Sequence, residues 1–350
     1  MNLERPNIQA GADSLRAHFA LRGQCVSVAD ATVLSKSPPE RYVVRYRVEI
    51  EAEIAENAET CWVVGKFDDS GAGARSYQIM QRVRAALNSV DAGDTVDTAV
   101  GDSGDDRPSA RATLAVPEPW YYVVGLQCLF LPYINAAPAS PHDTPACLNT
   151  CRLAGKALSE LHRLPLLPGP TLPVQRQLFE LISPHPMELA RVAPKYREPI
   201  TRLLDQIQGA AEVWRWPATV VHRDFQLRQM LLVGQTLWLL DWDQAANGDP
   251  ALDLAYFLGY LHTHLPTADA EQARSEFWRA YFDSAPNRWP AQDQTPLMER
   301  IELYLRFNFL RRACRRFRLR DQNWRAQMTE MLEAMSDHLL CRRLIPTGKF

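Results

Sequence analysis

The chain has 350 residues, of which 46% are apolar and 23% are charged, and its formal net charge at pH 7 is −2. This length and composition predict a globular protein with two lobes or domains and a sizeable core. A net charge so close to zero argues against bulk attraction to nucleic acid or to a membrane surface. The sequence has no apolar run of the kind that signal peptides or membrane spans require, so we expect a soluble cytoplasmic protein.

Residues 24–67 have the pattern of β-strands. The stretch RYVVRYRVEIEAE alternates between apolar and polar residues, and TCWVVGKF is a short β-rich run that contains Lys66. LSKSPPERY lies between an earlier strand-like segment and the first of these runs, and its composition is typical of a turn. A helix is predicted next, because ARSYQIMQRVRAALNSV places Ile79, Val83 and Leu87 on one face.

An aspartate-rich segment follows this helix. Residues 91–110 contain few apolar groups, which predicts a flexible insertion. Two strand-like runs in VPEPWYYVVGLQCLFLPYINAAP then lead into a proline-rich segment, where we place the boundary between lobes of residues 1–134 and 135–350. Thr144 followed by Pro145 predicts the start of a helix, and most of the chain beyond it has helical patterns.

Aspartates are concentrated in the otherwise apolar stretch between Val220 and Phe257, although an unpartnered buried carboxylate is costly. The runs MLLV and TLWLLDWD flank Gly234-Gln235, which predicts a β-hairpin. Asp224 lies shortly before the first strand and Asp241 lies at the end of the second, so both are expected at the same end of the hairpin. Carboxylates held so close favour a shared cation, and a small number of hard oxygen ligands suits Mg²⁺.

Asp249 and Asp253 have different expected roles. Asp249 is a good N-cap residue, and Pro250 fits the first turn of the helix that follows. This helix, ALDLAYFLGYL, is apolar all round and is therefore expected to be buried. A buried Asp253 needs hydrogen-bond donors, and the backbone N–H groups of the nearby segment His222-Arg223-Asp224 could supply them.

The segments HRDFQLRQ, LLDWD and GDPALDLA, in this order and spacing, resemble the catalytic core of the aminoglycoside phosphotransferase family of kinase-like small-molecule phosphotransferases. AGKALSELHRLP resembles the helix of that family that ends in Leu-His, and CWVVGKF resembles its strand with the phosphate-binding lysine. The resemblance spans roughly residues 25 to 320. It implies an α+β, bilobal protein-kinase-like fold, with a small β-rich nucleotide-binding lobe and a larger, mainly helical lobe for catalysis and acceptor binding.

The resemblance also implies roles for individual residues. Asp224 would orient or deprotonate the acceptor hydroxyl, and Lys66 would bind the α- and β-phosphates of ATP. Main-chain groups around the crossing segment would hydrogen-bond the adenine. Further residues would hold Mg²⁺ or support the site. The adenine-binding residues would be Leu131, Tyr133 and Ile134, the metal ligands Asp241, Gln229 and Asp243, and the supporting residues His222, Asp249 and Asp253.

The sequence departs from the family pattern at three places. Gln229 stands where the family usually has asparagine, LSKSPPERY has no glycine-rich loop, and SYQIMQ offers Gln78 and Gln81 instead of the glutamate that pairs with the lysine. The short connection between Asp241 and Asp249 leaves no room for a protein-kinase activation loop. A small hydroxylated acceptor is therefore favoured over a protein.

These observations favour an ATP-dependent phosphotransferase that acts on a hydroxyl of a sugar, glycoside, aminoglycoside or amino alcohol, with ATP and Mg²⁺ as cofactors. No nucleic acid, membrane or obligate protein partner is expected. The alternative is a nucleotide-binding pseudokinase with a regulatory or binding role, which the missing loop and glutamate favour. A metal-dependent hydrolase that uses His222, Asp224 and Asp241 is a weaker third hypothesis, because no second histidine motif completes a metal shell.

Two further features have more ordinary interpretations. RFNFLRRACRRFRLR, residues 306–320, has an apolar stripe at helical spacing, which predicts a packed helix with a basic outer face. Contact with nucleic acid, with an acidic patch of the protein or with an anionic acceptor is the alternative. His162 is expected to be a hydrogen-bonded core histidine.

Overall fold

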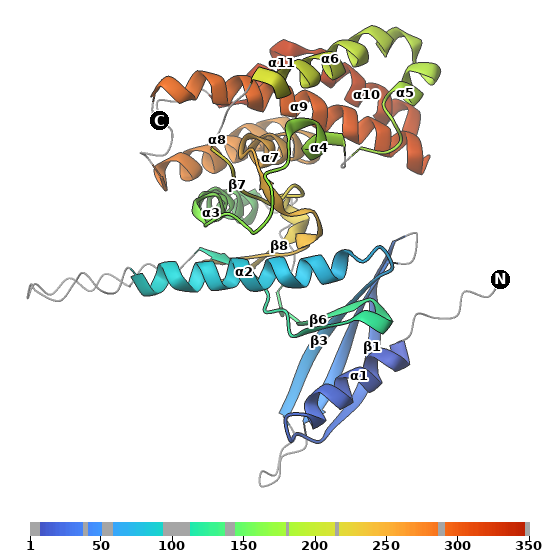
Figure 1. The fold of residues 1–350 in the computed structure, drawn as a ribbon. Coiled ribbons are helices and arrows are strands. Elements are labelled where there is room, and N and C mark those ends of the chain that lie inside the picture. Colours follow the sequence, from blue (N-terminus) through green and yellow to red (C-terminus); the bar gives the residue numbers. More distant parts are fainter. Residues whose placement is uncertain are drawn as a thin grey trace, which may run out of the picture. The chain divides into compact units, whose positions relative to one another are not determined.

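The computed structural model describes residues 8–37, 41–50, 59–93, 113–136, 144–179, 182–213, 217–285 and 291–346 (Figure 1). The chain forms two compact units. Unit 1 comprises Met1–Asp97, Val116–Ala136 and Leu240–Asp243, and unit 2 comprises Thr98–Ala115, Ala137–Leu239 and Gln244–Phe350. The predicted insertion lies outside the described residues from position 94 onward, as does the Pro-Pro-Glu part of the predicted turn at 38–40.

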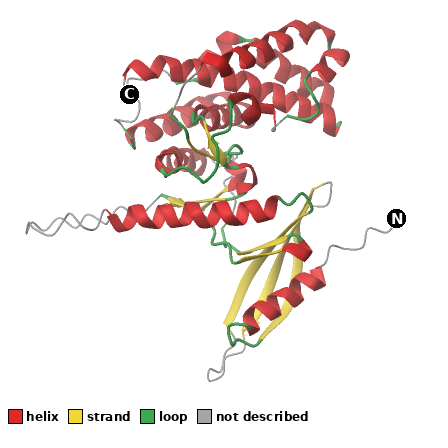
Figure 2. Ribbon diagram, viewed as in Figure 1, coloured by secondary structure: helices red, strands yellow, loops and turns green. Residues whose placement is uncertain are grey.

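Unit 1 is built on a five-stranded antiparallel sheet with the strand order β1-β2-β3-β6-β5. Strands are drawn in yellow in Figure 2. The strands are β1 (Val26–Ser37), β2 (Arg41–Ile50), β3 (Glu59–Asp68), β5 (Tyr121–Val123) and β6 (Cys128–Pro132). Two helices complete the unit, α1 (Ile8–Ala20) and the predicted α2 (Ala72–Gly93). The strands expected over residues 24–67 and in the segment before the crossing are therefore present.

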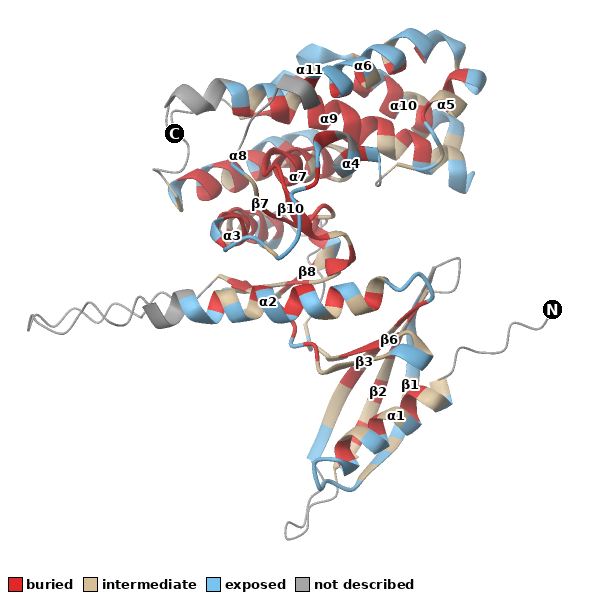
Figure 3. Cartoon of the chain, in the orientation of Figure 1, coloured by how far each residue is buried: buried red, intermediate tan, exposed pale blue. Residues whose placement is uncertain are grey.

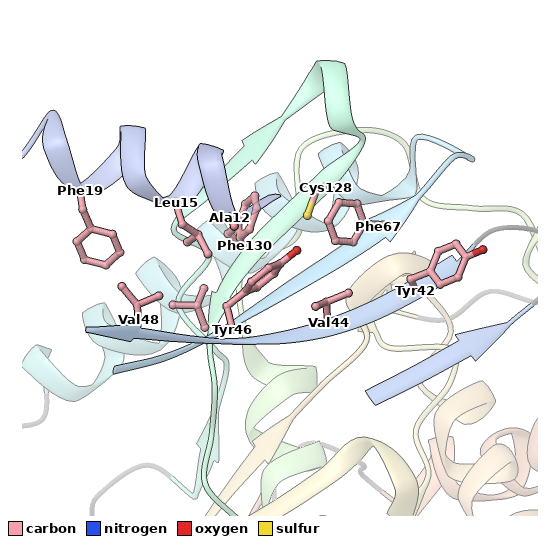
Figure 4. Packing of buried hydrophobic residues seen from close by; sticks show 11 residues of the cluster. Ala12, Leu15, Phe19, Tyr42, Val44, Tyr46, Val48, Phe67, Cys128 and Phe130 are labelled. Carbon is pink, nitrogen blue, oxygen red and sulfur yellow. The ribbon is translucent and has the colours of Figure 1, made fainter. Parts of the chain in front are cut away.

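The core of unit 1 lies between α1 and one face of this sheet (Figure 4). Alternate residues of β2 point to this face, because successive side chains of a strand point to opposite sides. Helix α1 supplies residues at helical spacing, and β3 and β6 supply the remainder. The buried members are Ala12, Leu15, Phe19, Tyr42, Val44, Tyr46, Val48, Val63, Phe67, Cys128 and Phe130.

Unit 2 is mainly helical. Its longer helices are α3 (Thr144–Arg163), α6 (Arg197–Val213), α7 (Ala251–His264), α8 (Thr267–Asp283), α9 (Ala291–Leu319) and α10 (Trp324–Ser336), and its short ones are α4 (Val174–Phe179), α5 (Met187–Val192) and α11 (His338–Leu344). Helix α3 begins at Thr144 as expected. It packs so closely on α8 that a Cβ at Gly155 would collide with the carbonyl oxygen of Phe277. Within the described ranges, no helix combines the length and hydropathy that a membrane crossing requires.

The predicted hairpin is formed by β8 (Met230–Val233) and β9 (Thr236–Leu239), with β4 (Leu114–Ala115) parallel to β9. Met230 pairs with Leu239, so the hairpin opens at the end where the loop before β8 enters and the chain leaves β9. A second small sheet pairs β7 (Thr219–Val221) with β10 (Ala246–Gly248). Helix α7 follows β10 and is buried along most of its length, as its apolar sequence predicted (Figure 3).

Candidate active site

Loop 222–229, between β7 and β8, is fastened to the buried carboxylate of Asp253. The backbone N–H groups of His222 and Arg223 donate to Asp253 Oδ2 and Oδ1, each at 2.7 Å. These are the donors predicted from the sequence for this carboxylate. Arg223 has a φ of 66°, a left-handed conformation that non-glycine residues adopt only when surrounding contacts hold it. The two hydrogen bonds therefore fix the backbone immediately before Asp224.

His162, on α3, links the Asp253 carboxylate of α7 to Tyr281 on α8. Its Nε2 lies 3.4 Å from Asp253 Oδ2, and its Nδ1 lies 2.9 Å from the hydroxyl oxygen of Tyr281 on α8. The ring is 1% exposed, so the expectation of a hydrogen-bonded core histidine is confirmed. Asp253 and His162 thus bring α3, α7 and α8 together behind loop 222–229.

Asp224 itself is surrounded by hydrogen-bond donors. Tyr256 on α7 donates its hydroxyl to Oδ1 at 2.7 Å, and the side-chain amides of Gln226 and Gln229 each donate to Oδ2 at 3.0 Å. The side chain of Asp224 is 18% exposed, and Arg311 Nη2 lies 4.0 Å from Oδ1. A partly accessible carboxylate with neutral donors on both oxygens can accept a further proton or hydrogen bond from a substrate hydroxyl.

Tyr256 was not among the site residues predicted from the sequence. Its position three residues after Asp253 places both residues on one face of α7, and this spacing was the available signal. Burial raises the pKa of the Tyr256 hydroxyl to about 12, and the charge of Asp224 contributes in the same direction. Tyr256 therefore remains a hydrogen-bond donor to Asp224 at neutral pH.

A second group of charged residues lies in unit 1 around Lys66, near the end of β3. Lys66 Nζ lies 2.5 Å from Asp241 Oδ1 and 2.7 Å from Asp243 Oδ2. Ser76 on α2 donates its hydroxyl to Asp243 Oδ1 at 2.5 Å, and Arg41 approaches Oδ2 at 3.9 Å. Burial alone would lower the pKa of Lys66, but Asp241 and Asp243 outweigh it and the pKa is raised. Lys66 is therefore held as a cation by these two aspartates.

The two aspartates could also hold a metal ion. Their carboxylates converge on one cation, and hard oxygen donors of this kind suit Mg²⁺, which commonly uses one or two carboxylates together with waters and substrate phosphates. Among the described residues, no group of three or more His, Cys, Asp or Glu side chains forms a complete protein cage for a metal. The donor set thus fits an ion that shares its coordination with a phosphate.

The residues expected at the nucleotide base lie at and beyond the end of β6. Leu131 pairs with Val64 in the sheet, and the Tyr133 N–H donates to the carbonyl oxygen of Trp62 at 2.9 Å. The carbonyl oxygen of Ile134 accepts from Ala136 N–H at 2.9 Å. The Tyr133 amide is therefore used within the protein, and the role of this segment in adenine binding stays a prediction.

Asp249 is fully buried and connects the start of α7 to α9. Its Oδ2 accepts from Arg300 Nε and from the Tyr304 hydroxyl, both at 2.9 Å, and its Oδ1 accepts from Ala251 N–H at 3.0 Å. The helix starts one residue later than expected, with Pro250 in the cap position. Burial raises the pKa of Asp249 despite the opposing charge of Arg300.

Residues 306–319 lie in α9 and form the predicted packed helix, with Arg315 and Arg318 exposed on its outer face. Three arginines nearer the start of this segment turn inward instead. Arg306 is only 3% exposed and donates to the carbonyl oxygen of Met335 and to Gln206 Oε1. Arg311 and Arg312 are half-buried and contact α7. The helix itself is present within α9, and the first members of its apolar stripe are buried as predicted. Arg306 and Arg312 turn inward because α6, α7 and α10 pack around α9 and offer their guanidinium groups acceptors.

Comparisons with known proteins agree with the motifs. The model of the phosphotransferase enzyme family, APH, matches residues 109–291, which is more than half of the chain. No curated protein sequence matches the chain. The solved structures that resemble it share little sequence but nearly its whole length, and at such low identity they show the fold alone.

Three of these structures illustrate the similarity. Aminoglycoside 2'-phosphotransferase-IIIa, solved as its GDP complex, is 15% identical, with 94% of this chain and 98% of that chain covered and a TM-score of 0.53. A choline/ethanolamine kinase family protein from Mesorhizobium loti is 15% identical, with 95% and 97% covered and a TM-score of 0.51. Spectinomycin phosphotransferase, in complex with ADP and spectinomycin, is 11% identical, with 96% and 97% covered and a TM-score of 0.50.

These structures have the protein-kinase-like α+β fold that the sequence resemblance implied. The family match covers the described part of the chain from β4 to the end of α8, including loop 222–229, the hairpin and α7. The chain therefore belongs to the phosphotransferase enzyme family, whose model matches more than half of it.

Proposed function

We propose that the enzyme transfers the γ-phosphoryl group of ATP to a hydroxyl of a small molecule. The observation that carries the choice of donor is the ammonium of Lys66 held against Asp241 and Asp243. A nucleoside triphosphate with its metal ion needs a cation for the phosphates and carboxylates for the metal, and this group provides both. Two of the similar structures are themselves nucleotide complexes, one with GDP and the other with ADP.

In this reaction the acceptor oxygen forms a bond to the γ-phosphorus while the bond from that phosphorus to the β,γ-bridging oxygen breaks, and ADP leaves. Asp224 accepts the hydrogen bond of the acceptor hydroxyl and takes its proton. Tyr256, Gln226 and Gln229 hold the carboxylate in place for this transfer. Positioning and charge neutralisation supply most of the catalysis in phosphoryl transfer, so this small number of groups is sufficient.

The nucleotide would be bound by residues at the end of β3, at the end of β6 and after β9. Lys66 binds the α- and β-phosphates, and backbone groups of Leu131, Tyr133 and Ile134 face the base. Mg²⁺ would be held by Asp241 with Asp243 and the side-chain oxygen of Gln229, and when bound it neutralises the charge that develops on the phosphates.

We further propose that residues 1–134 form the nucleotide-binding lobe and residues 135–350 the lobe for catalysis and acceptor binding. His222, Asp249 and Asp253 support the second lobe rather than react, because each is fully buried. All seven cysteines lie in the described ranges and none forms a disulfide, which fits a reducing cytoplasmic compartment.

The proposal is tested by acceptor-dependent release of ADP from ATP and magnesium, screened over sugars, glycosides, aminoglycosides and amino alcohols. Asp224→Asn keeps the size of the side chain but removes its capacity to take a proton. We expect this variant to lose turnover by a factor of about 1000 or more while Mg·ATP still raises its Tm. If the parent chain is stabilised by Mg·ATP but releases no ADP with any acceptor, the nucleotide-binding pseudokinase is the better description.

A further inference from the structure

The surroundings of Asp224 in unit 2 are strongly basic. Arg311 on α9 lies 4.0 Å from Asp224 Oδ1, and its guanidinium carbon lies 5.0 Å from the centre of the Tyr256 ring. Arg312 follows it, and Arg315 comes one turn later on the same helix. Arg228 belongs to loop 222–229, four residues after Asp224. Two elements that are distant in sequence thus bring arginines to the proposed catalytic carboxylate.

Arg311 is incompletely satisfied by the protein. Its side chain is only 22% exposed, and its Nη1 is buried with no hydrogen-bond partner among the described residues. The one carboxylate near it, Asp224, is already hydrogen-bonded by three neutral donors. A guanidinium that is removed from water without a full set of acceptors is costly, and a bound anion would satisfy it.

The neighbouring arginines also lack acidic partners. Arg312 donates to the carbonyl oxygen of Gly259 and to the ring of His264, and Arg228 donates to Gln226 Oε1. Within the described ranges, no carboxylate forms an ion pair with Arg228, Arg312 or Arg315, whereas Arg316 is paired with Asp321 at 2.7 Å. We call Arg228, Arg311, Arg312 and Arg315 the arginine group. Asp224 is the acid that lies against Arg311 and whose charge acts on Arg315.

Burial first, and neighbouring positive charges second, lower the pKa of Arg312 and of His264. Burial lowers the pKa of Arg312 to about 10, and the charges of Arg316 and Arg228 act in the same direction. Burial and the charge of Arg312 lower the pKa of His264 to about 4, so His264 is neutral at pH 7 and accepts the hydrogen bond from Arg312. The hydrogen-bond acceptors that the protein offers to Arg228 and Arg312 are thus neutral groups rather than acids.

We propose that the acceptor carries an anionic group, a carboxylate or a phosphate, and that the arginine group binds it beside the hydroxyl that is phosphorylated. This inference rests on the proposed function and names the substrate class of the same site. Guanidinium groups bind both anions through paired N–H donors. The 4.0 Å between Arg311 and Asp224 requires the anionic group to lie only a few bonds from the reacting hydroxyl, as in hydroxy acids, sugar acids and sugar phosphates. Polycationic aminoglycosides and quaternary amino alcohols would be repelled.

The chemical step is the transfer of the γ-phosphoryl group from ATP to the acceptor hydroxyl. The acceptor hydroxyl oxygen bonds to the γ-phosphorus, its proton passes to Asp224, and ADP departs with the bridging oxygen. The anionic group takes no part in bond making, and Arg311 acts as a specificity-determining residue that positions it. Its removal should therefore affect KM for the acceptor more than kcat.

The test compares acceptors matched in structure but different in charge. Gluconate and glucose 6-phosphate represent the two anions, glucose is the neutral analogue, and kanamycin and choline are the cations. We expect kcat/KM for at least one anionic acceptor to exceed that of glucose by about tenfold or more, and Arg311→Gln to reduce this ratio by about 10- to 100-fold. The KM for ATP should stay close to that of the parent.

Arg318→Gln is the matched control, because Arg318 is exposed near the end of the same helix. It should leave both the ratio and the KM for ATP unchanged. Preference for glucose or a cation, or a ratio unaffected by Arg311→Gln, would overturn the inference while leaving phosphotransfer intact. If neither these compounds nor the wider acceptor screen yields a phosphorylated product, the proposed function fails. Calorimetric titration with gluconate and with glucose 6-phosphate then tests the anion site separately. Saturable binding that Arg311→Gln abolishes would support the anion site, and no binding would overturn it.

Discussion

Replacing Asp253 with asparagine should release loop 222–229 while keeping the shape of the side chain. Both carboxylate oxygens of Asp253 accept a backbone N–H at 2.7 Å, and the residue is fully buried. An asparagine can accept at one oxygen only, and its NH₂ group would face the second N–H. The variant therefore loses one charge-assisted hydrogen bond and leaves a buried donor unsatisfied.

The expected cost is about 2–4 kcal/mol, from the energy of a hydrogen bond to a charged group and the desolvation of an unpaired donor. Because a difference of about 1.4 kcal/mol changes an equilibrium tenfold, local opening of the loop should become about 30- to 1000-fold more frequent. Hydrogen–deuterium exchange of the peptide that contains His222 and Arg223 measures this directly. Turnover should fall as well, because Asp224 follows the loosened backbone.

Asp283→Asn provides the control, since Asp283 is an exposed carboxylate at the end of α8. It should leave exchange in the loop and the unfolding midpoint in urea close to those of the parent. If Asp253→Asn showed the same exchange as Asp283→Asn, the two hydrogen bonds would not be what holds the loop, and the account of its support would be refuted.

Two further predictions concern buried charges in unit 2. Arg300→Met leaves Asp249 buried without its cation and should lower the free energy of unfolding by about 3–5 kcal/mol, measured in urea; a change below about 1 kcal/mol would show that Tyr304 and Ala251 N–H suffice. The second is a pH dependence of stability. Burial and Arg312 lower the pKa of His264 from 6.5 to about 4, so between these values the unfolded chain binds a proton that the folded chain does not, and stability is lost as pH falls through this window. His264→Gln should reduce the slope, which is at most about 1.4 kcal/mol per pH unit for one group, and an unchanged slope would contradict the shift.

Local sequence patterns were sufficient to predict the hairpin, the buried helix α7 and the donors to Asp253. The Gly234-Gln235 turn and the flanking β-rich runs determine the hairpin locally, and an all-apolar helix with one aspartate requires donors from its immediate neighbours. Helix α1 was not predicted, although Ala12, Leu15 and Phe19 have helical spacing. Such a short apolar face indicates a helix only once the sheet that it packs against is known.

The pairing of charged residues was harder to predict. Lys66 and Asp241 are 175 residues apart, and the sequence offered no sign that Asp241 and Asp243 would replace the expected glutamate partner on α2. The inward position of Arg306 could not be predicted either, because arginine at a helix surface is ordinarily solvated. In both cases the hydrogen-bond acceptors come from elements that are distant in the sequence. No local hydrophobic periodicity or sequence motif encodes such a contact.

The most direct test of the central claim follows the phosphoryl group itself. The full chain is incubated with magnesium, ATP labelled at the γ-phosphorus and the acceptor identified by ADP release, and the products are separated. We predict that the label appears as a phosphate ester of the acceptor, and that Asp224→Asn forms this ester about 1000-fold more slowly or not at all. Label that remains in ATP, or that leaves only as inorganic phosphate, would contradict the claim that this enzyme phosphorylates a small-molecule hydroxyl.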